Sequence, residues 1–186
     1  MTRTQLWTGR IAALVGIMLL ALSLRAAVVS VPPLLAQVTP AVGLTPLTTG
    51  FLAMLAPVAF AIFGLVTPRL INQLGLGVTL FISLGLAVAG QLRRPLAPNA
   101  PLFLLLSIVT LAGYGIGNVV LPPLVKKYFP DKIGVVTSGY VTLIAVGTWI
   151  SPQFAVPLAD LVNWQFSIGF WAVLSAVVAL PWIIQL

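Results

Sequence analysis

Six long apolar segments occupy most of this chain, and they restrict what it can fold into. Each is close to the ~20 residues that a helix needs to cross a bilayer. Lipid offers no partner to a free backbone amide, so a spanning segment must be a helix or a strand of a closed barrel. The apolarity is continuous rather than alternating, which excludes barrel strands. The sequence therefore predicts an all-α integral membrane protein with six transmembrane helices at residues 11–31, 47–66, 77–92, 101–125, 135–158 and 166–186.

The composition excludes a soluble protein and most catalytic chemistry. Of the 186 residues, 60% are hydrophobic and only 6% are charged, too few to cover the surface of a soluble domain of this length. The chain has no cysteine and no histidine, so it lacks thiol nucleophiles, thiolate metal sites and imidazole bases. We expect no enzyme activity, no cofactor and no metal site. The basic residues lie between apolar segments, so the net charge of +7 reports membrane topology, and no nucleic-acid partner is expected.

The basic residues also predict the orientation of the chain. With a cytoplasmic N-terminus, six basic residues lie inside and two outside, which obeys the positive-inside rule. We expect the outside pair, Arg93 and Arg94, to snorkel to the lipid headgroups. The prediction is a multi-pass protein of the cytoplasmic (inner or plasma) membrane, surrounded by lipid, with these residues inside: Arg3, Arg10, Arg69, Lys126, Lys127 and Lys132.

Three sequence echoes at a spacing of 89 or 90 residues indicate an internal duplication. They predict a single bundle, residues 1–186, built from two three-helix repeats at about 11–92 and 101–186. An odd number of spans in each repeat places the two copies in opposite orientation, which is the architecture of half of a major facilitator transporter. The matched stretches are 31–35 (VPPLL) with 121–125 (LPPLV), 48–51 (TTGF) with 137–140 (TSGY), and Pro68 with Pro157.

Two motifs resemble the cyanate and nitroimidazole transporter-like family of the major facilitator superfamily. The first is residues 22–27, LSLRAA, similar to the family's Asn-Leu-Arg-Pro or Asn-Leu-Arg-Ala pattern with Ser23 in place of Asn and Ala26 where Pro is frequent. The second is residues 115–126, GIGNVVLPPLVK, continued by FPDKIG at 129–134. The resemblance covers residues 14–180 but only six of the family's twelve helices, so it implies an N-terminal half.

One cytoplasmic loop departs from the superfamily pattern. The signature between the second and third helices is similar to Gly-x-Leu-x-Asp-Arg-x-Gly-Arg-Arg, whereas residues 68–77 read PRLINQLGLG. Asn72 and Gln73 replace the charged pair. The charge-relay gating usually assigned to that loop is therefore not expected here.

Arg25 is the first candidate site residue, because it lies inside the first span. Counted from Ile11 at 1.5 Å per residue, it is roughly 21 Å into a ~30 Å core. A central arginine costs about 2.5–3.5 kcal/mol, so it must face the bundle interior or water. It is either a structural brace that snorkels or binds backbone carbonyls, or a ligand for a small anion. No acidic residue lies in any span, and the repeat maps Arg25 onto Gly115, which favours the ligand role.

The other candidates are polar residues and helix-breaking prolines. Asn118 follows Tyr114 by four residues, so the two are expected to share a helical face. A single polar residue in a span more often makes a hydrogen bond to another helix than binds a solute. Further predicted lining residues are Tyr140 and Gln153, and the predicted hinges, where the helices stop or kink, are Pro32, Pro33, Pro122 and Pro123.

Taken together, the residues and the resemblance imply a secondary transporter that moves a small, polar or anionic solute by alternating access. The alternative is a truncated gene product or membrane scaffold that does not transport. The sixth span runs to Leu186 without a basic tail, which favours an incomplete unit. A second six-helix half or a second copy of the chain is the expected partner. No residue in a span offers a proton relay, so the coupling ion is left open.

Overall fold

The computed structural model describes residues 3–185, and side-chain burial within residues 10–183. Every regular element in this part of the chain is a helix, and six stretches are long and apolar enough to cross a membrane. The predicted all-α class with six spans is therefore confirmed. The elements are α1 (Arg3–Val29), η1 (Pro32–Leu34), α2 (Leu35–Val42), α3 (Pro46–Leu74), α4 (Leu76–Arg93), η2 (Arg94–Leu96), α5 (Ala100–Tyr128), α6 (Ile133–Leu161) and α7 (Trp164–Gln185), where η marks a 3-10 helix.

Local turn chemistry sets the ends of the helices. The left-handed backbone of Gly43, with φ of 72°, ends α2, and a φ of 84° at Gly75 separates α3 from α4. Such angles favour glycine because it has no Cβ. At the start of α3, the Thr45 and Thr48 side chains each accept a hydrogen bond from the other's backbone amide, which forms a capping box.

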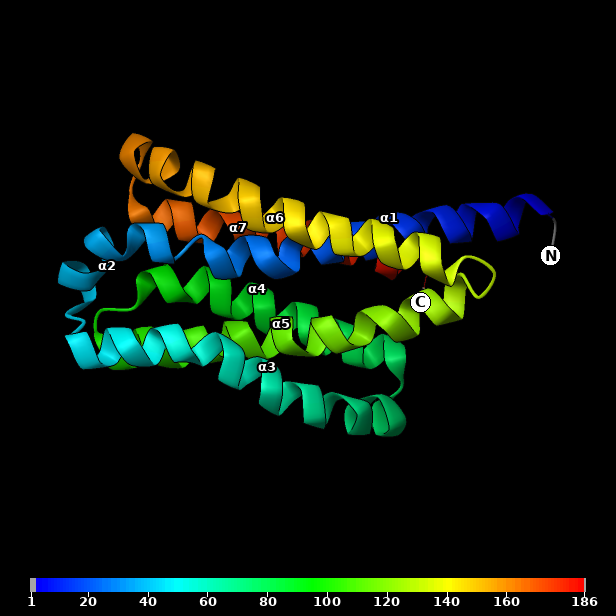
Figure 1. Ribbon diagram of the computed structural model, residues 1–186, viewed down its shortest axis with the longest axis horizontal. Coiled ribbons are helices and arrows are strands. Elements are labelled where there is room, and N and C mark those ends of the chain that lie inside the picture. Colours follow the sequence, from blue (N-terminus) through cyan, green and yellow to red (C-terminus); the bar gives the residue numbers. More distant parts are fainter. Residues whose placement is uncertain (1–2, 186) are drawn as a thin grey trace.

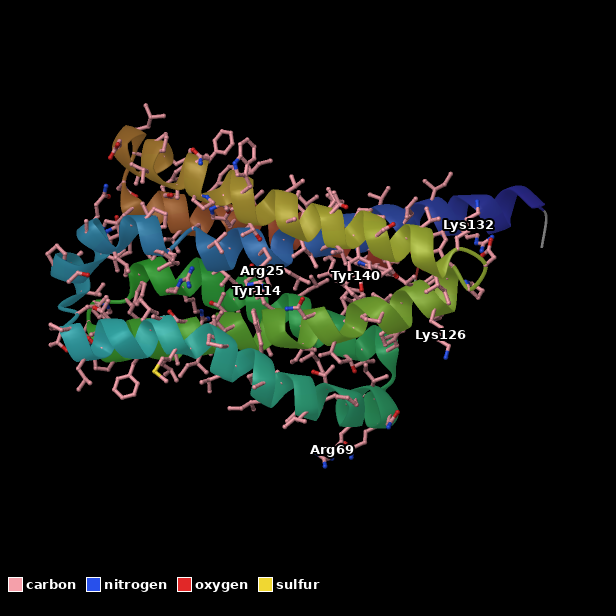
Figure 2. The ribbon with its side chains drawn as sticks, in the orientation of Figure 1. Arg25, Arg69, Tyr114, Lys126, Lys132 and Tyr140 are labelled. Carbon is pink, nitrogen blue, oxygen red and sulfur yellow. The ribbon has the colours of Figure 1, made fainter. Side chains whose placement is uncertain are left out.

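The six spans run side by side, with α6 along one edge of the bundle, α3 along the other, and α4 and α5 between them (Figure 1). One end holds the α3–α4 and α5–α6 turns, and we call it the basic end because Arg69, Lys126 and Lys132 lie there (Figure 2). The opposite end, which includes α2, is called the α2 end. Three basic residues that were expected on one side of the membrane therefore lie at one end of the bundle.

The neighbours of each span are consistent with an inverted repeat. Helix α1 packs mainly against α6 and α7, whereas α5 packs mainly against α3 and α4. Exchanging α1, α3 and α4 for α5, α6 and α7 maps one set of neighbours onto the other. The division into two repeats stays a prediction, and this exchange supports it.

Helices α4 and α5 approach closely through small residues. A Cβ added to Gly113 of α5 would lie 2.5 Å from the Ala87 backbone nitrogen, and one added to Gly90 of α4 would lie 2.7 Å from the Thr110 nitrogen. The Ser83 hydroxyl donates to the Gly113 carbonyl across the same contact, at 2.7 Å. Small residues and interhelical hydrogen bonds are how helices associate where lipid removes the hydrophobic driving force.

Helices α3 and α6 lie at the edges of the bundle and expose apolar side chains. Leu65 of α3 is 76% exposed and Trp149 of α6 is 70% exposed. These surfaces face lipid or another protein body. Figure 1 also shows that α3 changes direction partway along its length, and this helix contains two prolines, Pro57 and Pro68, which cannot donate a hydrogen bond to the preceding turn.

Candidate functional site

Arg25 lies on an uncovered face of α1. Its neighbours Leu24 and Ala26 are each 1% exposed, while Arg25 itself is exposed. The guanidinium carbon is 5.9 Å from the ring centroid of Phe60 on α3, a cation–π contact. The described residues offer Arg25 neither an ion pair nor a hydrogen bond. Within this six-helix unit the guanidinium thus faces outward between α1 and α3, rather than into the helix core.

The two carboxylates of the chain, Asp131 and Asp160, interact with residues other than Arg25. Asp131, in the α5–α6 turn, pairs with Arg10, and Asp160 at the end of α6 accepts a hydrogen bond from Gln37 at 3.4 Å. A hydrogen bond from its own backbone, reinforced by Arg10, lowers the pKa of the Asp131 carboxyl. The pair joins the start of the first span to the α5–α6 turn at the basic end. No acidic side chain is therefore placed to neutralise Arg25.

Helix α5 packs at Gly115 against the same residue of α3, Phe60, that Arg25 covers. A Cβ added to Gly115 would lie 3.0 Å from the Phe63 side chain and 3.4 Å from the ring of Phe60, the ring that Arg25 covers. Asn118 follows Gly115 by about one turn and is partly exposed. Helix α3 therefore packs against both Arg25 and the Gly115 turn of α5.

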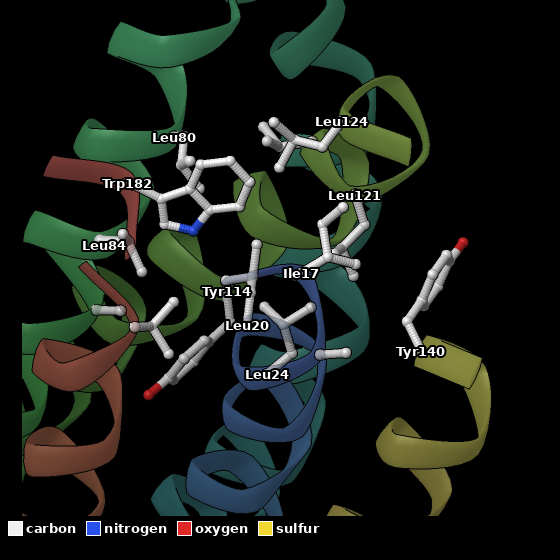
Figure 3. Packing of buried hydrophobic residues seen from close by; sticks show 14 of the residues in the cluster. Ile17, Leu20, Leu24, Leu80, Leu84, Tyr114, Leu121, Leu124, Tyr140 and Trp182 are labelled. Atoms are coloured by element: carbon white, nitrogen blue, oxygen red, sulfur yellow. The ribbon is translucent and has the colours of Figure 1, made fainter. Parts of the chain in front are cut away.

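Tyr114 is held in the buried core instead. It is only 2% exposed, and its hydroxyl is 2.9 Å from the Oγ atom of Ser175 on α7, which in turn is 2.8 Å from that of Ser23. Figure 3 shows Tyr114 and Tyr140 on opposite sides of α1. Tyr114 and Asn118, which the four-residue spacing was expected to place on one face, therefore differ in burial: Tyr114 lies in the core and Asn118 is partly exposed. The sequence offers no signal for the Ser23–Ser175 contact, which joins residues distant in the chain.

The remaining predicted lining residues lie apart on α6. Tyr140 is 9% exposed and packs in the main apolar cluster. Gln153 is exposed, and it is about 200° around the helix from Ser151, whose hydroxyl donates to the Ala26 carbonyl of α1. The structure thus buries Tyr114 and Tyr140 and leaves Arg25, Asn118 and Gln153 with exposed surface. Their roles in binding stay predictions.

The predicted hinge prolines behave in two ways. Pro32 and Pro33 interrupt the first span, because α1 ends at Val29 and a 3-10 turn precedes α2. Pro122 and Pro123 do not stop α5, which continues to Tyr128, so of the two expected outcomes, a stop or a kink, only the kink stays a prediction. A proline keeps a helical φ and only removes its own amide donor, and in a bundle the freed carbonyls find other partners.

Arg94 corrects another expectation. Arg93 is exposed, but Arg94 is 3% exposed instead of snorkelling to the headgroups. Its Nη2 donates to the Gln91 side chain at 2.9 Å, and its guanidinium carbon is 5.9 Å from the Phe103 ring centroid. Sequence reasoning missed it because neighbouring arginines in a turn give no sign of which one points inward. Its burial also leaves Arg93 as the exposed cation of the pair, which sharpens the charge asymmetry between the two ends.

Comparison with known proteins identifies transporters. No family model matches the chain. Two relatives are each 32% identical: "Uncharacterized transporter YycB" of Bacillus subtilis (strain 168), over 173 residues, 92% of this chain and 43% of the relative, and the "2-nitroimidazole transporter" of Escherichia coli (strain K12), over 157 residues, 84% of this chain and 40% of the relative. Over most of its length the six-helix chain is similar to these transporters. It spans about two fifths of the length of these relatives.

Proposed function

We propose that this chain forms one half of the translocation unit of a secondary transporter, which moves a small polar or anionic solute by alternating access. The observation that carries the proposal is the unpaired guanidinium of Arg25, inside a membrane span and on an open face of the bundle. A membrane-embedded arginine requires an anionic, polar or water partner. A solute carboxylate, or a planar group of similar shape, suits the fork of donors that a guanidinium presents.

The face of the bundle that exposes Arg25 would be covered by a second protein unit. The exposed apolar surfaces of α3 and α6 and the twofold longer relatives support a second six-helix half or a second copy of this chain. The solute would then lie between the two bodies, against Arg25 and Asn118 on this side. The break at Pro32 and Pro33 and the weakened turn at Pro122 and Pro123 are the points where the helices would flex during the exchange of access.

The test uses the chain in proteoliposomes, with 2-nitroimidazole and cyanate as separate labelled probes. We expect Arg25→Ala to lower uptake at least tenfold while insertion and monodispersity are unchanged. Arg25→Lys should also lose most uptake, because an ammonium lacks the planar fork. Arg69→Ala, at an exposed arginine of α3 near the basic end, is the matched control. Uptake that survives Arg25→Ala rejects the binding role, and loss of folded protein assigns Arg25 to a structural brace.

The second candidate function is a membrane scaffold or assembly partner that does not transport. The exposed apolar side chains of α3 and α6, which suit contact with a neighbouring membrane protein, favour it. Wild-type chain that moves neither probe, remains monomeric in detergent and co-purifies with a separate six-span protein would support this role. A chain that self-associates and accumulates a probe would exclude it.

A further inference from the structure

A buried arginine with incomplete hydrogen bonding lies at the α2 end of the bundle. Arg94 is 3% exposed, and the one hydrogen bond described for its side chain goes to Gln91, which is itself fully buried. Its Nε atom and the Gln91 Nε2 atom have no partner among the described residues. The Phe103 ring, at 5.9 Å, offers only a weak cation–π contact. A buried charge left without an anionic or hydrogen-bonding partner is strongly unfavourable.

Arg94 lines a cavity of about 230 Å³ between α1, α3 and α5. This volume is smaller than the roughly 300–1,000 Å³ of sites for drug-sized ligands, so it suits a smaller molecule. Arg25 is not among the lining residues, and this part of the chain contributes instead the end of α1 and the residues that follow it: Ala27, Val28, Val29, Val31, Pro32 and Leu35. The cavity therefore begins on the α2-end side of Arg25 and is a separate space. Its apolar walls are formed by Ala27, Val28, Leu52, Ala53, Ala56 and Leu111.

The polar groups of the cavity favour an acceptor-rich ligand. The hydroxyls of Ser107 and Thr110 donate to the carbonyls of Phe103 and Leu106, each at 2.8 Å, so their hydrogens are already used. Thr49 also lines the cavity, and none of the described hydrogen bonds uses its hydroxyl. The donors that remain among the lining residues come from Arg94 and Thr49. An anion with an apolar body matches both the guanidinium and the apolar walls.

We propose that this cavity is a second binding site, for a small monovalent organic anion such as a carboxylate with a short apolar body. The carboxylate binds the Arg94 guanidinium and the Thr49 hydroxyl, and the apolar body lies against Leu52, Ala53 and Ala56. The site goes beyond the proposed solute site at Arg25 and does not depend on it. An anion there supplies the counter-charge that the chain's own side chains do not provide to Arg94.

The test measures thermal stability of the purified full chain in a neutral detergent, as the temperature at which half of the protein leaves the monodisperse peak. The probes are sodium benzoate and sodium acetate, with sodium gluconate at equal ionic strength and neutral benzamide as controls. A ligand that binds only the folded state raises this temperature as its concentration passes its Kd. We expect benzoate to raise it by a few degrees and benzamide to leave it unchanged.

Matched variants locate the effect. The shift from benzoate should vanish in Arg94→Gln and persist in Arg93→Gln, the exposed neighbour. It should also persist in Arg25→Gln, so that failure of this site and failure of the proposed solute site are distinguishable. Equal shifts in the two variants of the arginine pair would overturn the proposal, as would a shift that only phosphatidylglycerol produces, which would assign the cavity to a lipid headgroup.

A second pair of variants applies if Arg94→Gln does not fold. Ala56→Leu fills the cavity and leaves Arg94 intact, whereas Ala61→Leu adds the same side chain at an exposed position of the same helix. The benzoate shift should be lost in the first and kept in the second. A wild-type chain that responds equally to benzoate and benzamide, or to neither, refutes the site without any variant and leaves water as the partner of Arg94.

Discussion

Gly113 offers the sharpest test of the helix packing, because its missing Cβ permits a close approach of the α4 and α5 backbones. In Gly113→Ala the new methyl group would lie 2.5 Å from the Ala87 nitrogen and 2.6 Å from the Ser83 carbonyl oxygen. Ordinary contacts begin near 3.4 Å, so the helices must separate by about 0.9 Å. Both obstructing atoms belong to the backbone, and no side-chain rotation can relieve them. The Ser83 hydrogen bond to the Gly113 carbonyl would lengthen as well.

The magnitude follows from two opposing terms. Overpacking of a tight interior costs about 1–3 kcal/mol, and the rigid backbone contact places this site at the upper end. Alanine in place of glycine favours a helix by about 0.5–1 kcal/mol. The net loss is therefore about 2 kcal/mol, or roughly a thirtyfold change in the folding equilibrium. The control is Gly85→Ala on α4, where the added Cβ meets nothing within 4 Å, so only the helix-favouring term remains.

The assay is unfolding in detergent followed by tryptophan fluorescence, with the two variants measured beside the wild type. We expect Gly113→Ala to unfold more readily than the wild type and Gly85→Ala to be as stable or more stable. Adding Ala87→Gly to Gly113→Ala should not rescue it, since the contact is with the Ala87 backbone. A Gly113→Ala variant as stable as Gly85→Ala, or a full rescue by the second change, would refute the packing described for α4 and α5.

Three further predictions concern a buried hydroxyl, an ion pair and the orientation. Ser175→Ala removes the hydrogen-bond partner of the Tyr114 and Ser23 hydroxyls and should lower stability by about 1–3 kcal/mol in the same unfolding assay. The lowered pKa of Asp131 means that its pairing with Arg10 is complete above the ordinary carboxyl pKa and is lost as the pH falls through the folded-state pKa. The small stability difference between wild type and Asp131→Asn should therefore shrink in acid. In intact cells, a membrane-impermeant maleimide should label Arg93→Cys but not Lys132→Cys.

Each of these predictions has a result that contradicts it. A Ser175→Ala protein with wild-type stability would mean that water or another group satisfies the two hydroxyls. A stability difference at Asp131 that is independent of pH would show that the ion pair contributes nothing. The natural chain has no cysteine, so any labelling of the chain comes from the introduced residue. Labelling of Lys132→Cys and not of Arg93→Cys would show the opposite orientation.

The sequence predicts the spans well because a membrane makes one rule dominant. Continuous apolarity and the hydrogen-bonding demand of the backbone determine that the segments are helices and roughly where they lie. The course of the first span was harder to foresee: α2 continues to Val42, since a 3-10 turn carries the chain past Pro33. Helix α5 likewise passes through Pro122, because a bundle tolerates a proline that a helix in water would not.

The candidate site was only partly predictable. The anomalous charge of Arg25 is visible in the sequence, but its position on an open face depends on the rotation of α1 in the bundle. The four-residue spacing of Tyr114 and Asn118 limits them to about 40° of arc, which at a helix interface is enough to separate core from open side. The burial of Arg94 rather than Arg93 depends on the turn at η2 and on α5 packing over it. Such choices belong to tertiary structure.

The burial of Arg94 also constrains how the chain is made. The span at Leu76–Leu96 is the least apolar of the six, and it ends in two arginines that a lone helix cannot easily carry into lipid. The groups that cover Arg94, including Phe103 and Ser107, belong to α5, which the ribosome makes next. Arg94 is therefore covered only when α5 packs against the third span, so the two helices depend on each other for the burial of this charge.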